Sequence, residues 1–121
     1  MDEFELWRAP DGVALDDPEL LGHRVLARDG GVGVVIGASP EVGSSHLIVR
    51  ARPWLPRSIV MLPAGLIAQI DPQARVVSVA AERSEIANAP ALDSDRVRDR
   101  AYRAELGLHY ARRRCAGVAA L

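Results

Sequence analysis

Residues 62–90 read LPAGLIAQIDPQARVVSVAAERSEIANAP, and the order of signals in this stretch decides the fold. GLIAQI is a short apolar run typical of a strand, and Asp71-Pro72 fits the first two positions of a type I turn. RVVSV then predicts a second strand, because it is rich in β-branched residues. A single helical turn capped by Ser84 is expected before Pro90 ends it. Together these signals indicate a small, mainly β fold.

The same rhythm of short strands and tight turns extends toward the N-terminus. LLGHRVLAR alternates His23, Val25 and Ala27 with the residues between them, which is the period of a strand. The Asp29-Gly30 pair predicts a hairpin that returns through VGVVIG, and HLIVRAR and IVML add two more strands. Closing such a sheet would remove its unpaired edges. We therefore predict a small closed antiparallel β-barrel of about six short strands.

The hydrophobic period changes after Pro90. Apolar residues now recur at alternating steps of four and three, namely Val97, Ala101, Ala104, Leu108, Ala111, Cys115 and Val118. This spacing predicts an amphipathic C-terminal helix over residues 93–121, packed on the barrel or on a partner. The expected organisation is an acidic N-terminal extension (1–19), a barrel domain (20–92) and this helix.

Composition excludes several classes of protein. The 121 residues suit one domain, and 49% hydrophobic with 26% charged residues is ordinary for a soluble globular chain. The formal net charge of −1 gives no overall attraction to nucleic acid or to an anionic membrane. The single cysteine, Cys115, excludes an internal disulfide and favours a reducing compartment. With no signal-peptide pattern and no apolar run of ~20 residues, we expect a cytoplasmic protein without membrane contact.

Several short motifs resemble those of the PRC-barrel family over residues 20–110. They are Leu21-Gly22-His23-Arg24-Val25, Leu62-Pro63 followed by Ile67, Ile70-Asp71, and the run from Ile86 to Pro90. The resemblance is to a free-standing bacterial member, and it implies a small barrel that serves as an adaptor between proteins. The family includes the barrel domain of a ribosome maturation factor, so the resemblance also implies an alternative, an RNA- or ribosome-associated assembly factor.

The sequence RARPWLPRS is the main candidate for a partner-binding surface. Its prolines stiffen the loop, and Trp and Arg are frequent interface hot spots. The predicted partner-binding residues are Arg50, Arg52, Trp54, Leu55 and Arg57. An equally weighted interpretation is that Trp54 covers the open end of the barrel.

The arginine-rich helix supplies the alternative RNA-binding set. Its residues are Arg96, Arg100, Arg103, Arg112, Arg113 and Arg114. Asp95, Asp99 and Glu105 interrupt the run of positive charge, and this favours an ordinary solvated helix face over phosphate binding.

No pattern in the sequence predicts catalysis. The glycines of residues 30–37 lie among β-branched residues and open no helix, so a phosphate-binding loop is not expected. His23, His46 and His109 lack the spacing of a local metal site, with or without Cys115. We therefore predict a non-enzymatic protein-interaction module with no catalytic residues, metal or cofactor. Its partner is another protein, or a second copy in a homodimer.

Overall fold

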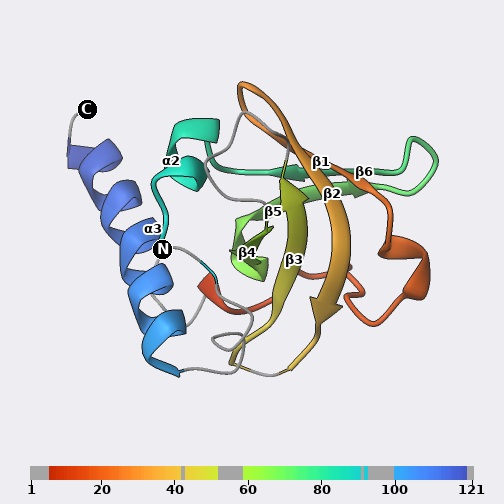
Figure 1. Ribbon diagram of the computed structural model, residues 1–121, viewed down its shortest axis with the longest axis horizontal. Helices are drawn as coiled ribbons and strands as arrows, with labels where there is room; N and C mark the ends of the chain where they lie inside the picture. The colour runs from red at the N-terminus through yellow and green to blue at the C-terminus, as the bar shows by residue number, and fades with distance from the viewer. Residues whose placement is uncertain (1–5, 42, 52–58, 91, 93–99, 120–121) are drawn as a thin grey trace.

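The computed structural model describes residues 6–41, 43–51, 59–90, 92 and 100–119, with side chains in the last segment described as far as Tyr110. Its strands are β1 (Arg24–Ala27), β2 (Gly30–Ser39), β3 (His46–Ala51), β4 (Ile59–Pro63), β5 (Ile67–Asp71) and β6 (Val76–Val79). Short 3₁₀ turns lie at η1 (Pro18–Leu20) and η2 (Ala64–Leu66), and the helices are α2 (Arg83–Ala87) and α3 (Arg100–Ala119) (Figure 1).

The strands form one open, mixed sheet, and the predicted closed antiparallel barrel is wrong. Their order is β4-β3-β2-β1-β6-β5, so β4 and β5 are the two edges and do not pair with each other. Strand β1 pairs antiparallel with β2 but parallel with β6. The predictions of a mainly β chain and of a C-terminal helix are confirmed.

The reason for the open sheet lies at η2, between β4 and β5. Strands β4 and β5 run in the same direction within the sheet. The chain therefore changes course at Ala64–Leu66 but does not turn back on itself. A hairpin between β4 and β5 is therefore excluded. Strand β5 pairs instead with β6 beyond the Asp71 turn, where Asp71 Oδ1 accepts hydrogen bonds from the amides of Gln73 (3.0 Å) and Ala74 (3.1 Å).

The predicted hairpin between β1 and β2 is confirmed, with Ala27 opposite Gly30. Further along β2, the strand passes unusually close to β3 at Gly33. A Cβ atom at that position would overlap the carbonyl oxygen of Arg50, so only glycine fits without moving the neighbouring backbone. This close approach accounts for one of the glycines in the glycine-rich stretch without any ligand.

Most of the hydrophobic core lies on the concave side of the sheet. Alternate strand residues such as Val25, Val35 and Val49 are fully buried there. On the other side, Met61 and Pro63 of β4 are also buried, in register with Ile48 and His46 of β3. Residues Leu6, Trp7 and Leu15 belong to the same core, and the Ser45 amide donates to the Trp7 carbonyl at 3.1 Å. The N-terminal segment therefore packs against the sheet.

Helix α2 begins at Arg83, and its N-cap lies two residues before the predicted cap. Glu82, not Ser84, is the N-cap, because its side chain accepts from the amide of Glu85 while the Glu85 carboxylate accepts from the Glu82 amide at 3.3 Å. This reciprocal pair is a capping box. It leaves Ser84 exposed inside the helix.

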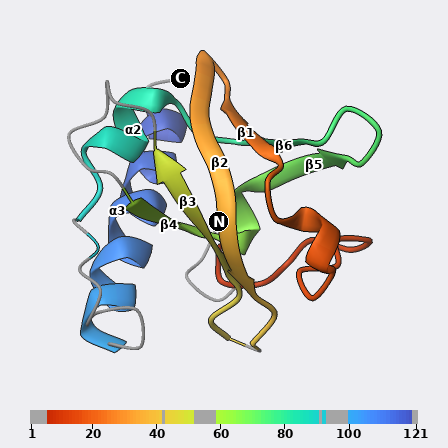
Figure 2. The ribbon, with the colours of Figure 1, turned by 45° about the vertical axis from the view of Figure 1, so that its right-hand side comes forward.

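Helix α3 packs through a different face from the one that the sequence predicts. Tyr102, Leu106 and Tyr110, spaced four residues apart, are buried, while Ala101 and Ala104 are exposed and Leu108 is 50% exposed. Large side chains remove more apolar area from water than alanines do, and the Tyr102 hydroxyl also donates to the Pro90 carbonyl at 3.2 Å. The remaining members of the predicted stripe lie outside the described side chains. Figure 2 shows α3 beside α2, on the opposite side of the molecule from η1.

Candidate functional site

The convex side of the sheet carries a row of side chains that crosses four strands. Residues on alternate positions point away from the core, and the register aligns Ile59 with Arg50, Arg50 with Val34, and Val34 with Arg24. Arg24, Arg50 and Ile59 are exposed and Val34 is half-buried. An arginine therefore lies on each side of Val34.

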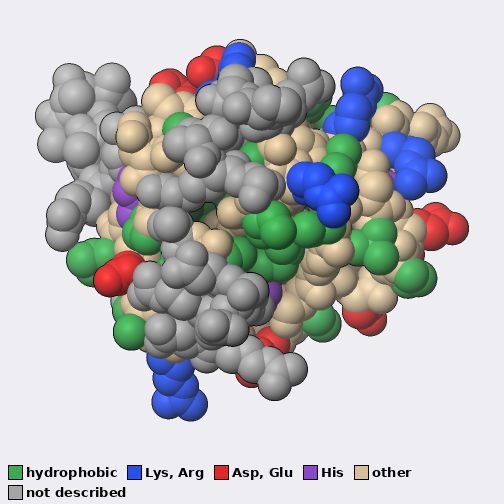
Figure 3. Space-filling model, in the orientation of Figure 1, with side chains coloured by type: hydrophobic (Ala, Val, Ile, Leu, Met, Phe, Trp, Pro, Cys, Tyr) green, Lys and Arg blue, Asp and Glu red, His purple; other side chains and the backbone are tan. Residues whose placement is uncertain are grey.

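Apolar side chains surround this row. Ile36 is 38% exposed at a bulge in β2 and Ile59 is 37% exposed, while Leu26 and Ile48 are half-buried. We call this surface the outer sheet face, and it comprises Arg24, Leu26, Val34, Ile36, Ile48, Arg50 and Ile59. Figure 3 shows hydrophobic side chains gathered near the middle of the visible face, in front of β2 and β3, with basic side chains close by.

Both charged residues of the outer sheet face are arginines. The same row continues from Arg24 through Val76 of β6 to Asp71 at the end of β5, which is the acidic end of the row. Strands β1 to β4 contain no aspartate or glutamate, so Arg24 and Arg50 have no acidic neighbour within those strands. Exposed apolar patches on monomeric proteins are frequently binding surfaces. This surface is therefore suited to an apolar segment that carries negative charge.

Of the predicted partner-binding residues, the structure describes only Arg50, which lies on the outer sheet face. Arg52, Trp54, Leu55 and Arg57 lie outside the described residues, so neither interpretation of Trp54 is tested.

The alternative RNA-binding set is described only in part. Arg100 is exposed on α3 and Arg103 is half-buried. Arg96 lies outside the described residues, as do the side chains of Arg112, Arg113 and Arg114.

The histidines that the sequence offered as metal ligands occupy separate environments. His46 is buried and its Nδ1 lies 2.6 Å from the Ser44 carbonyl oxygen, and burial lowers its pKa. His109 Nε2 lies 2.8 Å from the Glu85 carbonyl oxygen. Within the described residues, no group of three His, Cys, Asp or Glu side chains could hold a metal ion.

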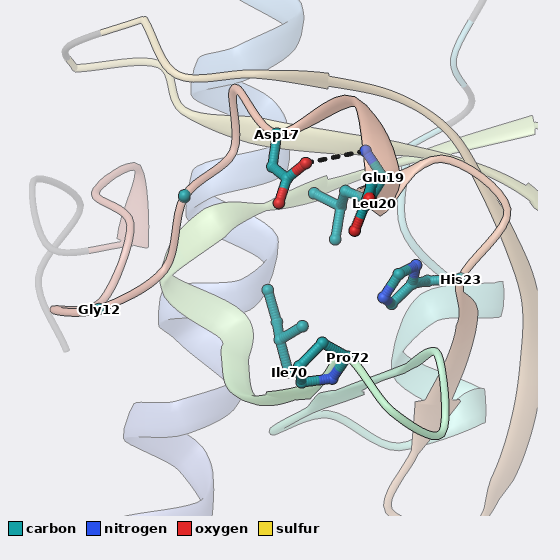
Figure 4. Close-up of a pocket in the computed structure, with 8 residues that line it drawn as sticks. Gly12, Asp17, Glu19, Leu20, His23, Ile70 and Pro72 are labelled. Atoms are coloured by element: carbon teal, nitrogen blue, oxygen red, sulfur yellow. Dashed lines mark hydrogen bonds between the residues drawn. The ribbon is translucent and has the colours of Figure 1, made fainter.

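A second candidate site is a cavity of about 200 Å³ beside η1. It is lined by Gly12, Ala14, Asp17, Glu19, Leu20, His23, Ile70 and Pro72 (Figure 4). Sequence reasoning did not find this cavity, because its walls come from segments far apart in the chain. The only sequence signal was the alternation that places His23 on the same side of the strand as the buried Val25 and Ala27.

Comparisons with known proteins assign this chain to no family. No protein-family model matches the sequence, and no curated protein matches it either. Among solved structures, a 16S ribosomal RNA processing protein, RimM, from Pseudomonas aeruginosa is similar, with a TM-score of 0.48 and 15% identity over 62% of this chain and 47% of that chain. The chain therefore spans about half the length of that protein. Similarity at this level carries no conclusion about the family of this chain or about what it binds.

The described helices include none that is long and apolar enough to cross a membrane.

Proposed function

We propose that this protein is a non-enzymatic interaction module of the PRC-barrel type, which binds an acidic, apolar segment of another protein on the outer sheet face. One observation carries the proposal. Exposed Ile36 and Ile59 lie beside Arg24 and Arg50, on strands that contain no acidic residue.

The proposal follows from how such surfaces contribute to binding. Burying the isoleucines would contribute affinity in proportion to the apolar area removed from water, roughly 25 cal/mol per Å². The arginines would contribute orientation and selectivity, because guanidinium groups form paired hydrogen bonds with carboxylates. Arg24 and Arg50 lie two strands apart, so their backbones are roughly 10 Å apart at about 4.8 Å per strand. A matching partner presents two carboxylates at a similar separation with an apolar side chain between them.

The non-enzymatic part of the proposal rests on the sequence, where no nucleophile and base are placed together.

Site-specific photo-crosslinking tests the proposal directly. A photoreactive phenylalanine derivative placed at Ile36 should capture a discrete protein from a lysate of the protein's own organism, with or without ribonuclease. The crosslinked peptide should contain both acidic and apolar residues. The same group at the exposed Gln73, on the β5–β6 turn, is the matched control and should not capture that protein. Reversing both charges with Arg24→Glu and Arg50→Glu should abolish capture.

Three results would contradict the proposal. One is equal capture from position 73, and another is a crosslink only to a second copy of this chain. The third is capture that disappears with ribonuclease, which would favour the alternative of an RNA- or ribosome-associated assembly factor.

A further inference from the structure

The cavity beside η1 brings together two segments that are distant in the sequence. One wall comes from residues 12–23, which include η1, and the other comes from the end of β5 and the turn after it, at Ile70 and Pro72. Leu20, Ile70 and Pro72 make the cavity partly apolar, and Asp17, Glu19 and His23 supply its polar groups (Figure 4). This mixture of apolar walls and a few polar groups is typical of small-molecule sites.

His23 is the unusual member of this set. Its side chain is only 4% exposed, and Nδ1 has no hydrogen-bond partner in the structure. Figure 4 shows the imidazole ring directed into the cavity from the start of β1. Nδ1 itself is fully buried and closed to the cavity, whereas the tip of the ring, which carries Nε2, faces it. A guest in the cavity would therefore meet the imidazole at Nε2, which accepts a hydrogen bond when it is unprotonated.

The acidic residues of the cavity also retain bonding capacity. Asp17 accepts from the Glu19 amide through Oδ1 at 2.9 Å, which caps η1, and its second carboxylate oxygen takes no part in the cap. Glu19 is exposed, and no basic side chain lines the cavity. Arg75 donates to the Leu21 carbonyl at 3.3 Å and is not among the lining residues. The cavity is therefore negatively charged, with two carboxylates and one imidazole as its polar groups.

We infer that this cavity binds a small aliphatic cation with an ammonium or guanidinium head. Carboxylates only accept hydrogen bonds, and an imidazole accepts one at its unprotonated nitrogen, so a cationic donor satisfies both kinds of group. An aliphatic stem would lie against Leu20, Ile70 and Pro72. The volume of about 200 Å³ equals roughly six or seven waters at about 30 Å³ each, which suits a guest of the size of one long side chain. A metal ion is not proposed, because the described residues hold no three-ligand group.

NMR titration of the whole chain tests this inference. We expect n-butylammonium and n-butylguanidinium to shift the ring resonances of His23 saturably, whereas butyrate should leave them unchanged. Lysine and arginine with both termini blocked form a second arm. Tighter binding in that arm would identify the guest as a side chain of another protein, and tighter binding of the simple cations would identify a free metabolite. Either result supports a cation site.

Two kinds of variant distinguish a loss of cation binding at the cavity from a loss of folding. Asp17→Asn combined with Glu19→Gln removes both charges and keeps the capping oxygen, and it should weaken cation binding at least tenfold. Ala14→Leu should fill part of the cavity and weaken binding without changing charge. Glu41→Gln, at an exposed residue that does not line the cavity, should bind as the wild type does.

Two results would overturn the inference. One is the absence of any saturable shift of His23 with all four cations, which would mean that water alone fills the cavity. The other is binding that the double charge variant leaves unchanged. This inference is independent of the outer sheet face, because the two surfaces share no residue.

Discussion

His109 Nε2 lies 2.8 Å from the carbonyl oxygen of Glu85, which joins the middle of α3 to α2. The His109 ring also meets the Tyr110 ring edge to face, with centroids 4.9 Å apart. The described part of α3 is therefore attached within its own chain through a polar contact as well as through buried side chains.

Replacing His109 with phenylalanine should destabilise the protein by about 1–3 kcal/mol, because the Glu85 carbonyl loses its donor in a partly buried place. Phenylalanine keeps an aromatic ring beside Tyr110, so the change isolates the hydrogen bond. Urea unfolding followed by circular dichroism measures the effect. An unchanged urea midpoint would show that water replaces the imidazole as the donor to the Glu85 carbonyl with no loss of stability.

Two leucines on α3 give a matched comparison of its faces. Leu106 is fully buried, so Leu106→Ala should reduce the free energy of unfolding by about 2–5 kcal/mol. Leu108 is 50% exposed, and Leu108→Ala should change it by less than about 0.5 kcal/mol. Thermal unfolding of both variants provides the measurement. If Leu108→Ala proved the more damaging, the stripe predicted from the sequence would be the true packing face.

Two glycines of β2 test the close approach of β2 to β3. Gly33→Ala would place a methyl group on the Arg50 carbonyl oxygen, and because backbone cannot easily move, we expect a loss of about 1–3 kcal/mol or more. Gly37→Ala is the control, since its Cβ would lie 3.5 Å from the Ile48 Cβ, an ordinary contact. Chemical denaturation should separate the two variants clearly, and equal stabilities would contradict the described spacing of the strands.

Stability should also fall in mildly acidic solution because of His46. Burial is the largest influence and lowers its pKa below the ordinary 6.5; the nearby Arg103 also lowers it, while the Ser44 carbonyl and Glu41 act in the opposite direction. Below about pH 6.5 the unfolded chain binds a proton that the folded His46 resists, so the free energy of unfolding decreases as the pH falls toward the folded pKa.

The variant His46→Asn tests this assignment, because an asparagine amide can still donate to the Ser44 carbonyl but does not titrate. Unfolding curves at several values between about pH 7 and pH 5 should show a shallower loss of stability in the variant. Parallel curves for the two proteins would mean that other groups cause the pH dependence.

Local structure was the part of the fold that the sequence predicted best. Alternation around Val25 and the β-branched run at Val76–Val79 located strands because strand periodicity is a local property. Asp71 acts in its turn as expected, through hydrogen bonds to amides two and three residues ahead. The closure of the sheet was predicted wrongly, since it depends on the direction of the chain after η2, which no local pattern determines.

The sites were less predictable for the same reason. Helical spacing of apolar residues fits both the alanine stripe and the Tyr102–Leu106–Tyr110 face of α3. Which of the two faces is buried depends on tertiary packing. The cavity at His23 requires Ile70 and Pro72 to lie beside η1, a contact between distant segments. Arg50 was chosen because it flanks the Trp54 loop, yet its place on the outer sheet face arises from its register with Val34 and Ile59.

A charge-exchange measurement of affinity tests the central claim, that the outer sheet face binds an acidic, apolar segment. The segment identified by crosslinking would be titrated into wild-type protein and into Arg50→Glu, with calorimetry as the readout. We predict that Arg50→Glu weakens binding at least tenfold, and that an acidic-to-arginine change in the segment restores most of that loss. Equal affinities for the wild type and Arg50→Glu, or no restoration by the exchanged segment, would contradict the claim.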